Sequence, residues 1–261
     1  MATLQMNFLS MRLGLQENVT VFIPSIAPGQ DTAGKSYSEL YPKGKKFKTL
    51  WLLGDEYGDD STVLNYSGIL RIAEKYGFAV VFPCTYEKLY SDDPIGQKFT
   101  ENVSEEVYGV CMGTFPLSRK REDNIIAGFS LGAYGAMKCA LTAPDQYGAV
   151  VMIGGAYEKD IKNGYFKALK ANMKANDSEP HQELEWAEDD DAELKAEGKD
   201  LPKVLVINAL KAPLSAFTGR AAENLKADGF DVTEIVKDAE DDWYFRDSAL
   251  EDAFAWFGKE A

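Results

Sequence analysis

Ser130 stands between two glycines in the stretch "NIIAGFSLGAYGAMKCAL", which covers residues 124–141. The apolar run before the serine predicts a strand, and the small-residue spacing after it predicts a helix. A sharp strand-to-helix turn exposes a serine hydroxyl and requires small residues two places before and after it, as Gly128 and Gly132 are. The backbone N–H of Leu131 would then point toward a developing oxyanion. This arrangement predicts a nucleophilic serine.

A serine nucleophile requires a base, and the sequence offers few candidates. The one histidine, His181, lies in a polar segment that is typical of an exposed helix start. Asp241 lies in the acidic stretch "DAEDD", where neighbouring carboxylates could raise the pKa of one carboxyl. An ordinary aspartate, with a pKa of about 3.9, accepts a hydroxyl proton poorly. The composition of this stretch favours a solvated acidic loop.

The elements that must position Ser130 alternate along the chain. Eight short apolar runs predict strands, at residues 4–9, 19–24, 48–54, 78–83, 124–129, 149–154, 203–208 and 231–236. Five segments show helical spacing, at residues 61–76, 101–113, 131–143, 215–228 and 247–257. This order predicts an α/β protein with a mostly parallel sheet and helices on both faces. The first two runs lie close together and predict an antiparallel pair.

We expect residues 1–261 to form one domain, because the length and the 45% hydrophobic content suit a single large core. Residues 157–201 break the alternation with helical stretches, Pro180 and an acidic run, but no strand. We interpret this segment as a helical cap insertion over the carboxyl edge of the sheet.

A second motif, "GQDTAGKS" at residues 29–36, formally matches a phosphate-binding loop. Such a loop works between a strand and a helix whose amino-terminal N–H groups hold the phosphates. Here Pro24 and Pro28 separate the motif from the preceding strand, and Pro42 with Gly44 ends any helix that follows. The context predicts a hairpin loop rather than a nucleotide site.

The composition argues against several classes of function. A formal charge of -14 and a pI near 4.6 leave no basic field to attract nucleic acid or an anionic membrane. We recognise no secretory signal and no membrane-spanning run. Three cysteines without metal-ligand spacing indicate reduced thiols, so we expect a cytoplasmic protein without metal or cofactor. The composition is compatible with a homo-oligomer.

Segments along nearly the whole chain resemble the esterase D-like α/β-hydrolases, in particular the bacterial tributyrin, acetyl and feruloyl esterases. The similar segments are "MATLQMNFLSMRLG", "KKFKTLWLLGDEYGDD", "LYSDDPIGQKFTENVSEEV", "FPLSRKREDNIIAGFSLGAYGAMKCAL" and "DDWYFRDSALEDAFAWF". The resemblance implies the α/β-hydrolase fold. It also implies cleavage of small acyl or aryl esters, including those of acylated carbohydrates.

The resemblance places the nucleophile on Ser130 but departs from the family at three other positions. The family's catalytic acid falls on Ala212, which has no carboxyl group, and its histidine falls on Asp241. Its His-Gly oxyanion segment is replaced by one that contains Asp55, with Glu56 beside it. A carboxylate beside a developing oxyanion opposes its charge.

Two more side chains belong to the predicted pocket. Cys84 follows the run 78–83, at the edge where this fold keeps its pocket, and without a nearby imidazole or cation to lower its pKa we expect a buried, inert thiol. Trp243 is expected in the core or the pocket wall.

The residues favour an esterase-family protein whose catalysis is impaired and whose pocket is kept for binding a small ester, or is a relic. Whether the chain is an enzyme is open at this point. The first alternative is an active short-chain acyl or aryl esterase that uses Asp241 or His181 as its base. The second is a non-catalytic interaction protein, and the last is the nucleotide-binding loop.

Overall fold

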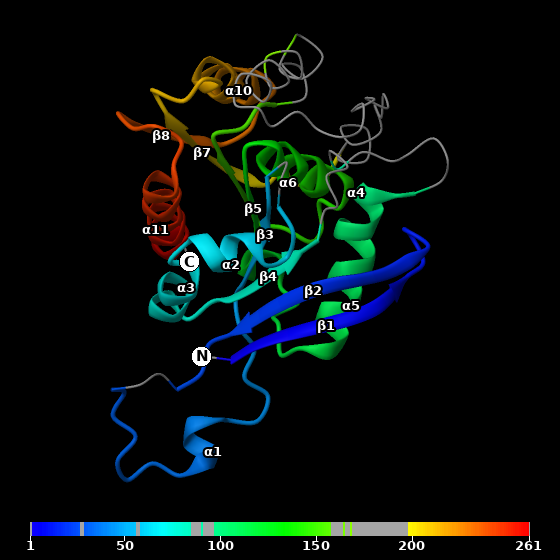
Figure 1. Ribbon diagram of the computed structural model, residues 1–261, viewed down its shortest axis with the longest axis vertical. Helices are drawn as coiled ribbons and strands as arrows, with labels where there is room; N and C mark the ends of the chain where they lie inside the picture. The colour runs from blue at the N-terminus through cyan, green and yellow to red at the C-terminus, as the bar shows by residue number, and fades with distance from the viewer. Residues whose placement is uncertain are drawn as a thin grey trace.

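The computed structural model describes residues 2–26, 29–55, 58–84, 90, 97–157, 164, 168 and 198–260. Within them, one sheet has the strand order β1-β2-β4-β3-β5-β6-β7-β8 (Figure 1). The strands are β1 (Ala2–Ser10), β2 (Leu15–Ile23), β3 (Thr49–Leu53), β4 (Ala79–Pro83), β5 (Asn124–Phe129), β6 (Ala149–Ile153), β7 (Lys203–Ala209) and β8 (Val232–Lys237). β2 pairs antiparallel with β1 and β4, and the other neighbours are parallel. The predicted antiparallel entry and parallel sheet are confirmed.

Helices cover both faces of the sheet. The described ones are α1 (Tyr37–Leu40), α2 (Thr62–Tyr66), α3 (Ile69–Tyr76), α4 (Phe99–Glu101), the π-helix η1 (Asn102–Val107), α5 (Tyr108–Thr114), the 3₁₀ turn η2 (Arg121–Asp123), α6 (Leu131–Thr142), α10 (Ser215–Ala227) and α11 (Trp243–Glu260). One core lies between the sheet and η1, α5, α6 and α10, and the other between the sheet and α2, α3 and α11. The central strands are therefore buried on both faces, which is why they read as continuous apolar runs.

Helix boundaries differ from the sequence prediction where tertiary contacts decide them. The predicted helix 61–76 is two helices, because the Gly68 N–H at the break donates to the Asp247 carboxylate at 2.8 Å. The predicted helix 247–257 begins earlier, at Trp243, because Asp242 accepts a hydrogen bond from the Phe245 N–H at 2.8 Å and caps the first turn.

The connection that contains "GQDTAGKS" is not a hairpin, and that part of the prediction is wrong, because β4 lies between β2 and β3 in the sheet. The segment extends away from the sheet and carries the single turn α1 (Figure 1). Lys35 Nζ donates to the Asp31 carbonyl at 3.2 Å, and Ser36 forms a capping box with Glu39. The two side chains that a phosphate loop would use are thus held in local contacts.

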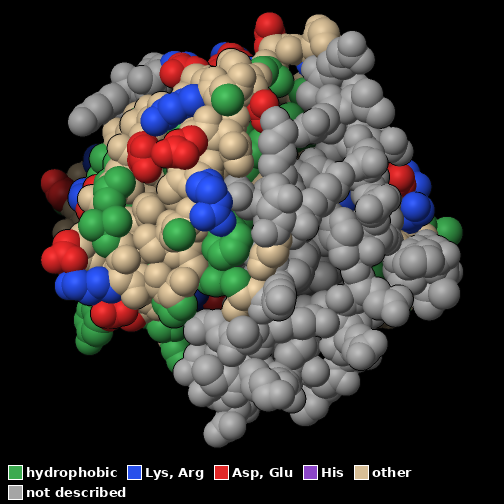
Figure 2. Space-filling view, turned by 90° about the horizontal axis from the view of Figure 1, so that it is seen from above, with side chains coloured by type: hydrophobic (Ala, Val, Ile, Leu, Met, Phe, Trp, Pro, Cys, Tyr) green, Lys and Arg blue, Asp and Glu red, His purple; other side chains and the backbone are tan. Residues whose placement is uncertain are grey.

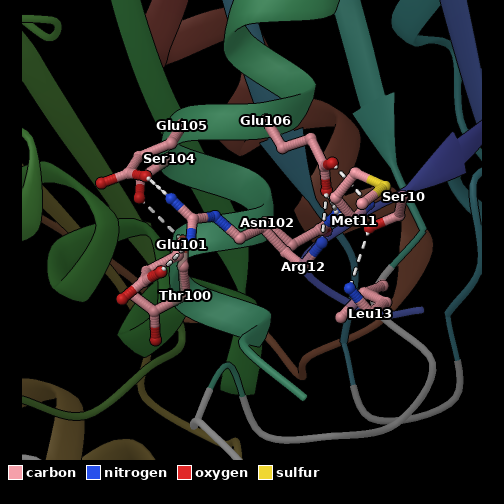
Figure 3. Close-up of polar contacts among 10 residues, drawn as sticks. All are labelled: Ser10, Met11, Arg12, Leu13, Thr100, Glu101, Asn102, Ser104, Glu105 and Glu106. Atoms are coloured by element: carbon pink, nitrogen blue, oxygen red, sulfur yellow. Dashed lines mark hydrogen bonds and ion pairs between the residues drawn. The ribbon is translucent and has the colours of Figure 1, made fainter. Parts of the chain in front are cut away.

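Charged contacts hold the turn between β1 and β2 against the end of α4 and against η1 (Figure 3). Arg12 reaches Glu101 at 3.0 Å and Glu105 at 2.6 Å. The Glu106 carboxylate accepts from the Ser10 hydroxyl at 2.5 Å and from the Met11 N–H at 2.6 Å. These contacts hold the antiparallel edge of the sheet against the helical layer.

Most of the predicted cap, residues 157–201, lies outside the described residues, and so does His181. The three cysteines, Cys84, Cys111 and Cys139, are buried thiols that form no disulfide. Among the described residues, no helix is long and apolar enough to cross a membrane.

Candidate active site

Ser130 joins β5 to α6 in a strained backbone conformation. Its φ of 48° and ψ of -114° lie where a residue with a side chain is rarely found. Its N–H donates to the Ile153 carbonyl at 2.9 Å, which fixes the turn against the end of β6. A Cβ on Gly128 would lie 2.1 Å from the carbonyl carbon of Gly132, so the tight turn excludes side chains at this position. The predicted strand–serine–helix turn is confirmed.

The end of β3 lies directly against this turn. A Cβ on Gly132 would lie 2.2 Å from the Gly54 carbonyl oxygen, and the Tyr90 hydroxyl donates to the same oxygen at 2.8 Å. The Tyr90 ring in turn packs on Gly135 of α6. Gly54 of the predicted oxyanion segment is thus held against the turn that carries the serine, and Asp55 of the same segment follows it.

Asp241 reaches the same edge of the sheet from the loop after β8. Its Oδ2 lies 3.6 Å from where a Cβ on Gly154 would stand, just after β6. The next residue, Gly155, is packed so closely that its Cβ would lie 2.8 Å from the Ser130 carbonyl oxygen. The position expected for a catalytic histidine is therefore beside the turn that carries the serine.

Arg246, which the sequence analysis did not identify, joins the two carboxylates. Its Nε donates to Asp241 Oδ1 at 2.9 Å and its Nη1 to Asp55 Oδ2 at 2.6 Å. The exposed fractions of the three side chains are 12% for Arg246, 14% for Asp55 and 23% for Asp241. We call Asp55, Arg246 and Asp241 the ion triad.

Aromatic rings enclose the guanidinium. It lies over the rings of Trp243, at 4.9 Å, and Phe129, at 5.2 Å. Burial lowers the pKa of Arg246, but the hydrogen bonds and charges of Asp241 and Asp55 outweigh that effect and raise the pKa above its usual value. The group is a permanent cation, so the ion triad carries a net charge of about -1 when both carboxyls are ionised.

The solvated acidic loop predicted around Asp241 is wrong for that residue, because its carboxylate is partly buried against Arg246. Its neighbours differ in role. Asp242 caps α11, and Asp238 forms an exposed ion pair with Lys211 at 3.1 Å. Asp238, Asp241 and Asp242 therefore each have a separate partner.

The remaining predicted residues occupy the same edge of the sheet or lie outside the described residues. Ala212 follows β7, where its N–H donates to the Ala209 carbonyl at 3.1 Å and its methyl group packs on the core. Leu131 begins α6, and Cys84 is buried directly after β4. Trp243 stacks on Tyr66 at 5.5 Å, consistent with a wall of the site. Glu56 lies outside the described residues.

A weak signal for Arg246 exists in the sequence. In "DDWYFRD" it follows Asp241 by five positions, which places it about one turn into the helix that begins at Trp243 and close to the loop that carries Asp241. The bond to Asp55 spans 191 positions and has no local signature. Among the described residues, no group of three or more histidine, cysteine or acidic side chains could hold a metal ion.

The sheet and the strained serine between β5 and α6 define an α/β-hydrolase. The chain belongs to the family described as "Putative esterase", which matches residues 78–211 and so includes the serine turn. The resemblance to esterases that the sequence indicated is confirmed.

Individual relatives agree with this assignment. An acetyl esterase of Caldicellulosiruptor saccharolyticus is 26% identical and is aligned over 99% of both chains. The structure of the S-formylglutathione hydrolase of Staphylococcus aureus is 26% identical, with a TM-score of 0.72 and 98% of both chains covered. A fluorophosphonate-binding serine hydrolase of the same organism has the same TM-score and coverage at 24% identity.

Proposed function

We propose that this member of the esterase family is catalytically impaired: its pocket binds a small ester, but Ala212 and Asp241 stand at the positions where the family has its catalytic acid and histidine. The ion triad carries this proposal. Asp241 stands where the family's pattern has a histidine, and Asp55 belongs to the segment that replaces the family's oxyanion segment. The acetyl esterase relative supports a short acyl ester as the ligand class. The resemblance to the wider esterase family extends this class to aryl esters and acylated carbohydrates.

Both oxygens of the Asp241 carboxylate are already engaged by its partner. Arg246 donates from Nε to Oδ1 at 2.9 Å and from Nη2 to Oδ2 at 3.4 Å. Hydrogen bonds to a charged group contribute about 1.5–3 kcal/mol each, so turning an oxygen toward the serine hydroxyl would sacrifice part of this stabilisation. Ala212, at the position of the family's acid, supplies no carboxylate to orient another base.

The alternative of an active esterase has two observations in its favour. Ser130 keeps a strained backbone, which costs on the order of 1–3 kcal/mol and is often kept for chemistry. The Leu131 N–H also remains at the start of α6, where the helix dipole favours negative charge. In this alternative Asp241, or His181 from outside the described residues, serves as the base.

Hydrolysis of short aryl acetates between pH 5 and 9 tests the proposal. Oxyanion stabilisation and binding alone leave roughly 10³ to 10⁴-fold acceleration over water, so weak activity by itself decides nothing. The comparison is between the wild-type protein and Ser130→Ala, Asp241→Asn and His181→Ala. Asp238→Asn is the matched control, because Asp238 lies in the same loop but pairs with Lys211.

The proposal predicts that none of these substitutions changes the rate by more than about twofold, because no covalent catalysis is lost. Saturable turnover that disappears in Ser130→Ala would contradict it. A further loss in Asp241→Asn or in His181→Ala, with Asp238→Asn unchanged, would identify the base of an active esterase.

A further inference from the structure

Lysine and arginine side chains gather at the amino ends of β3 and β5, at the opposite end of these strands from Ser130. Phe47 and Leu117 form a parallel bridge, in which the Phe47 carbonyl accepts from the Ser118 N–H at 2.9 Å. This pairing brings together two basic segments that are far apart in the sequence, "KGKK" at residues 43–46 and "RKR" at residues 119–121.

The two segments border a cavity of about 630 Å³ that is open to solvent. Four cationic side chains line it, Lys46, Lys48, Arg119 and Lys120, against one carboxylate, Asp123. We call it the basic cavity. Its volume lies within the range of about 300–1,000 Å³ that is typical of small-molecule sites.

The cations of the basic cavity have no acidic partners within the described part of the chain. Arg119 donates to the Met112 carbonyl at 3.1 Å, which positions it, and Lys48 lies over the Phe257 ring at 5.6 Å. Lys46 and Lys120 are exposed. Asp123 accepts from the Ser118 hydroxyl at 2.6 Å rather than from a lysine. The positive charge of the cavity is therefore not neutralised locally.

This concentration of positive charge is unusual for the molecule, which carries a net charge of -14. Several lysines elsewhere in the described part of the chain are paired with acids, as Lys211 is with Asp238 and Lys226 with Glu234. On the face seen from above α10, acidic and basic side chains are interspersed (Figure 2). A local excess of one sign inside a concave surface focuses the field on ligands of the opposite sign.

We propose that the basic cavity binds a small soluble anion with several phosphate groups. Lysine ammonium groups bind phosphate as compact point charges, and the guanidinium of Arg119 can bond two phosphate oxygens at once. Four cations exceed what a single phosphate needs, which favours a polyphosphate group. The negative remainder of the molecule repels large anionic surfaces, whereas a small anion enters the cavity alone.

Titration calorimetry with inorganic tripolyphosphate tests this site. The test variant is Lys46→Ala with Lys120→Ala, and the matched control is Lys211→Ala with Lys226→Ala, which changes the net charge equally. We expect saturable binding to the wild-type protein, at least about tenfold weaker in the test variant and changed by less than about twofold in the control. Binding should also weaken as salt is added.

Acetylation of lysines gives a second measurement on the unmodified protein. Tripolyphosphate should protect Lys46 and Lys120 from acetylation but leave Lys211 and Lys226 reactive. Equal losses of affinity in both double variants would overturn the proposal, as would the absence of saturable binding to the wild-type protein. So would binding to vesicles that contain phosphatidylinositol bisphosphate without binding of free tripolyphosphate, because the anion would then be a lipid surface.

Discussion

The guanidinium of Arg246 determines what two carboxylates at the candidate site can do. Asp55 alone would oppose an oxyanion, and Asp241 alone could accept a proton. Between them, Arg246 offsets part of the negative charge and occupies oxygens of both side chains. The result is a stable ionic arrangement beside a serine, in place of an imidazole that can gain and lose a proton near neutral pH.

A second acid, Glu17, is buried away from this site in surroundings that favour its protonated form. Glu17 of β2 is fully buried, and its Oε2 accepts from Asn102 Nδ2 at 2.6 Å. Within the described residues its Oε1 has no hydrogen-bond partner. Burial raises the pKa of Glu17 to about 7, assisted by the charge of Glu106 and opposed by the bond from Asn102.

Glu17 should therefore make the stability depend on pH. Its pKa is raised in the folded state, so the folded protein binds more protons than the unfolded chain between about pH 4.5 and 7. The free energy of unfolding should fall across this window, by about 3 kcal/mol at most, and be constant above it. Urea denaturation at several pH values checks this. Glu17→Gln should abolish the fall in the free energy of unfolding, whereas Glu223→Gln, at an exposed position of α10, should leave that fall unchanged.

The sequence was sufficient to predict the strand–serine–helix turn at Ser130, because that turn is a local motif. The departures from the esterase pattern at Asp55, Ala212 and Asp241 stay predictions from the resemblance. The sequence was not sufficient for Arg246, whose role depends on contacts between α11, the loop after β8 and the end of β3. It also misjudged Asp241, because an acidic stretch does not reveal that a cation from the next helix will be buried against it.

The turn between β5 and α6 depends on close contact between elements. Gly132 has no side chain because the backbone of β3 passes where a Cβ would stand, 2.2 Å from the Gly54 oxygen and 2.7 Å from the Leu53 oxygen. Two backbone oxygens cannot move aside as a flexible side chain can. The approach of α6 to β3 is thus what keeps Ser130 and Asp55 on neighbouring elements.

Gly132→Ala should separate α6 from β3 and lower the free energy of unfolding by roughly 3 kcal/mol. Gly109→Ala is the matched control, since Gly109 lies in α5 with no atom within 4 Å of an added Cβ. That control should gain about 0.5–1 kcal/mol, because alanine is the better helix former. Chemical denaturation of both variants measures the difference, and equal stabilities would refute the packing argument.

Strands were predicted better than helix ends, for a physical reason. The strands β3 to β7 are buried on both faces, so their continuous apolar composition alone is enough to predict them as strands. The break at Gly68 instead depends on the Asp247 carboxylate, which accepts a hydrogen bond from the Gly68 N–H in the folded chain. The start of α11 at Trp243 depends on Asp242, which accepts from the Phe245 N–H.

The net charge of the whole molecule does not describe how positive and negative side chains are distributed over it. The net charge of -14 predicts a surface unsuited to nucleic acid, yet the Phe47–Leu117 bridge assembles four cations around one cavity. The same bridge connects the amino ends of β3 and β5, whose other ends carry Asp55 and Ser130. The fold thus places an acidic site and a basic cavity at opposite ends of the same two strands.

The most direct test of the central claim is the rate at which Ser130 reacts with a fluorophosphonate. The comparison is between the wild-type protein and a repaired variant that combines Asp55→Gly, Ala212→Asp, Asp241→His and Arg246→Gln. The last change prevents a buried cation from being left without its two partners. If the ion triad takes the place of the base, the folded repaired variant should be labelled at least about tenfold faster. Wild-type labelling at Ser130 that is already as fast would contradict the account.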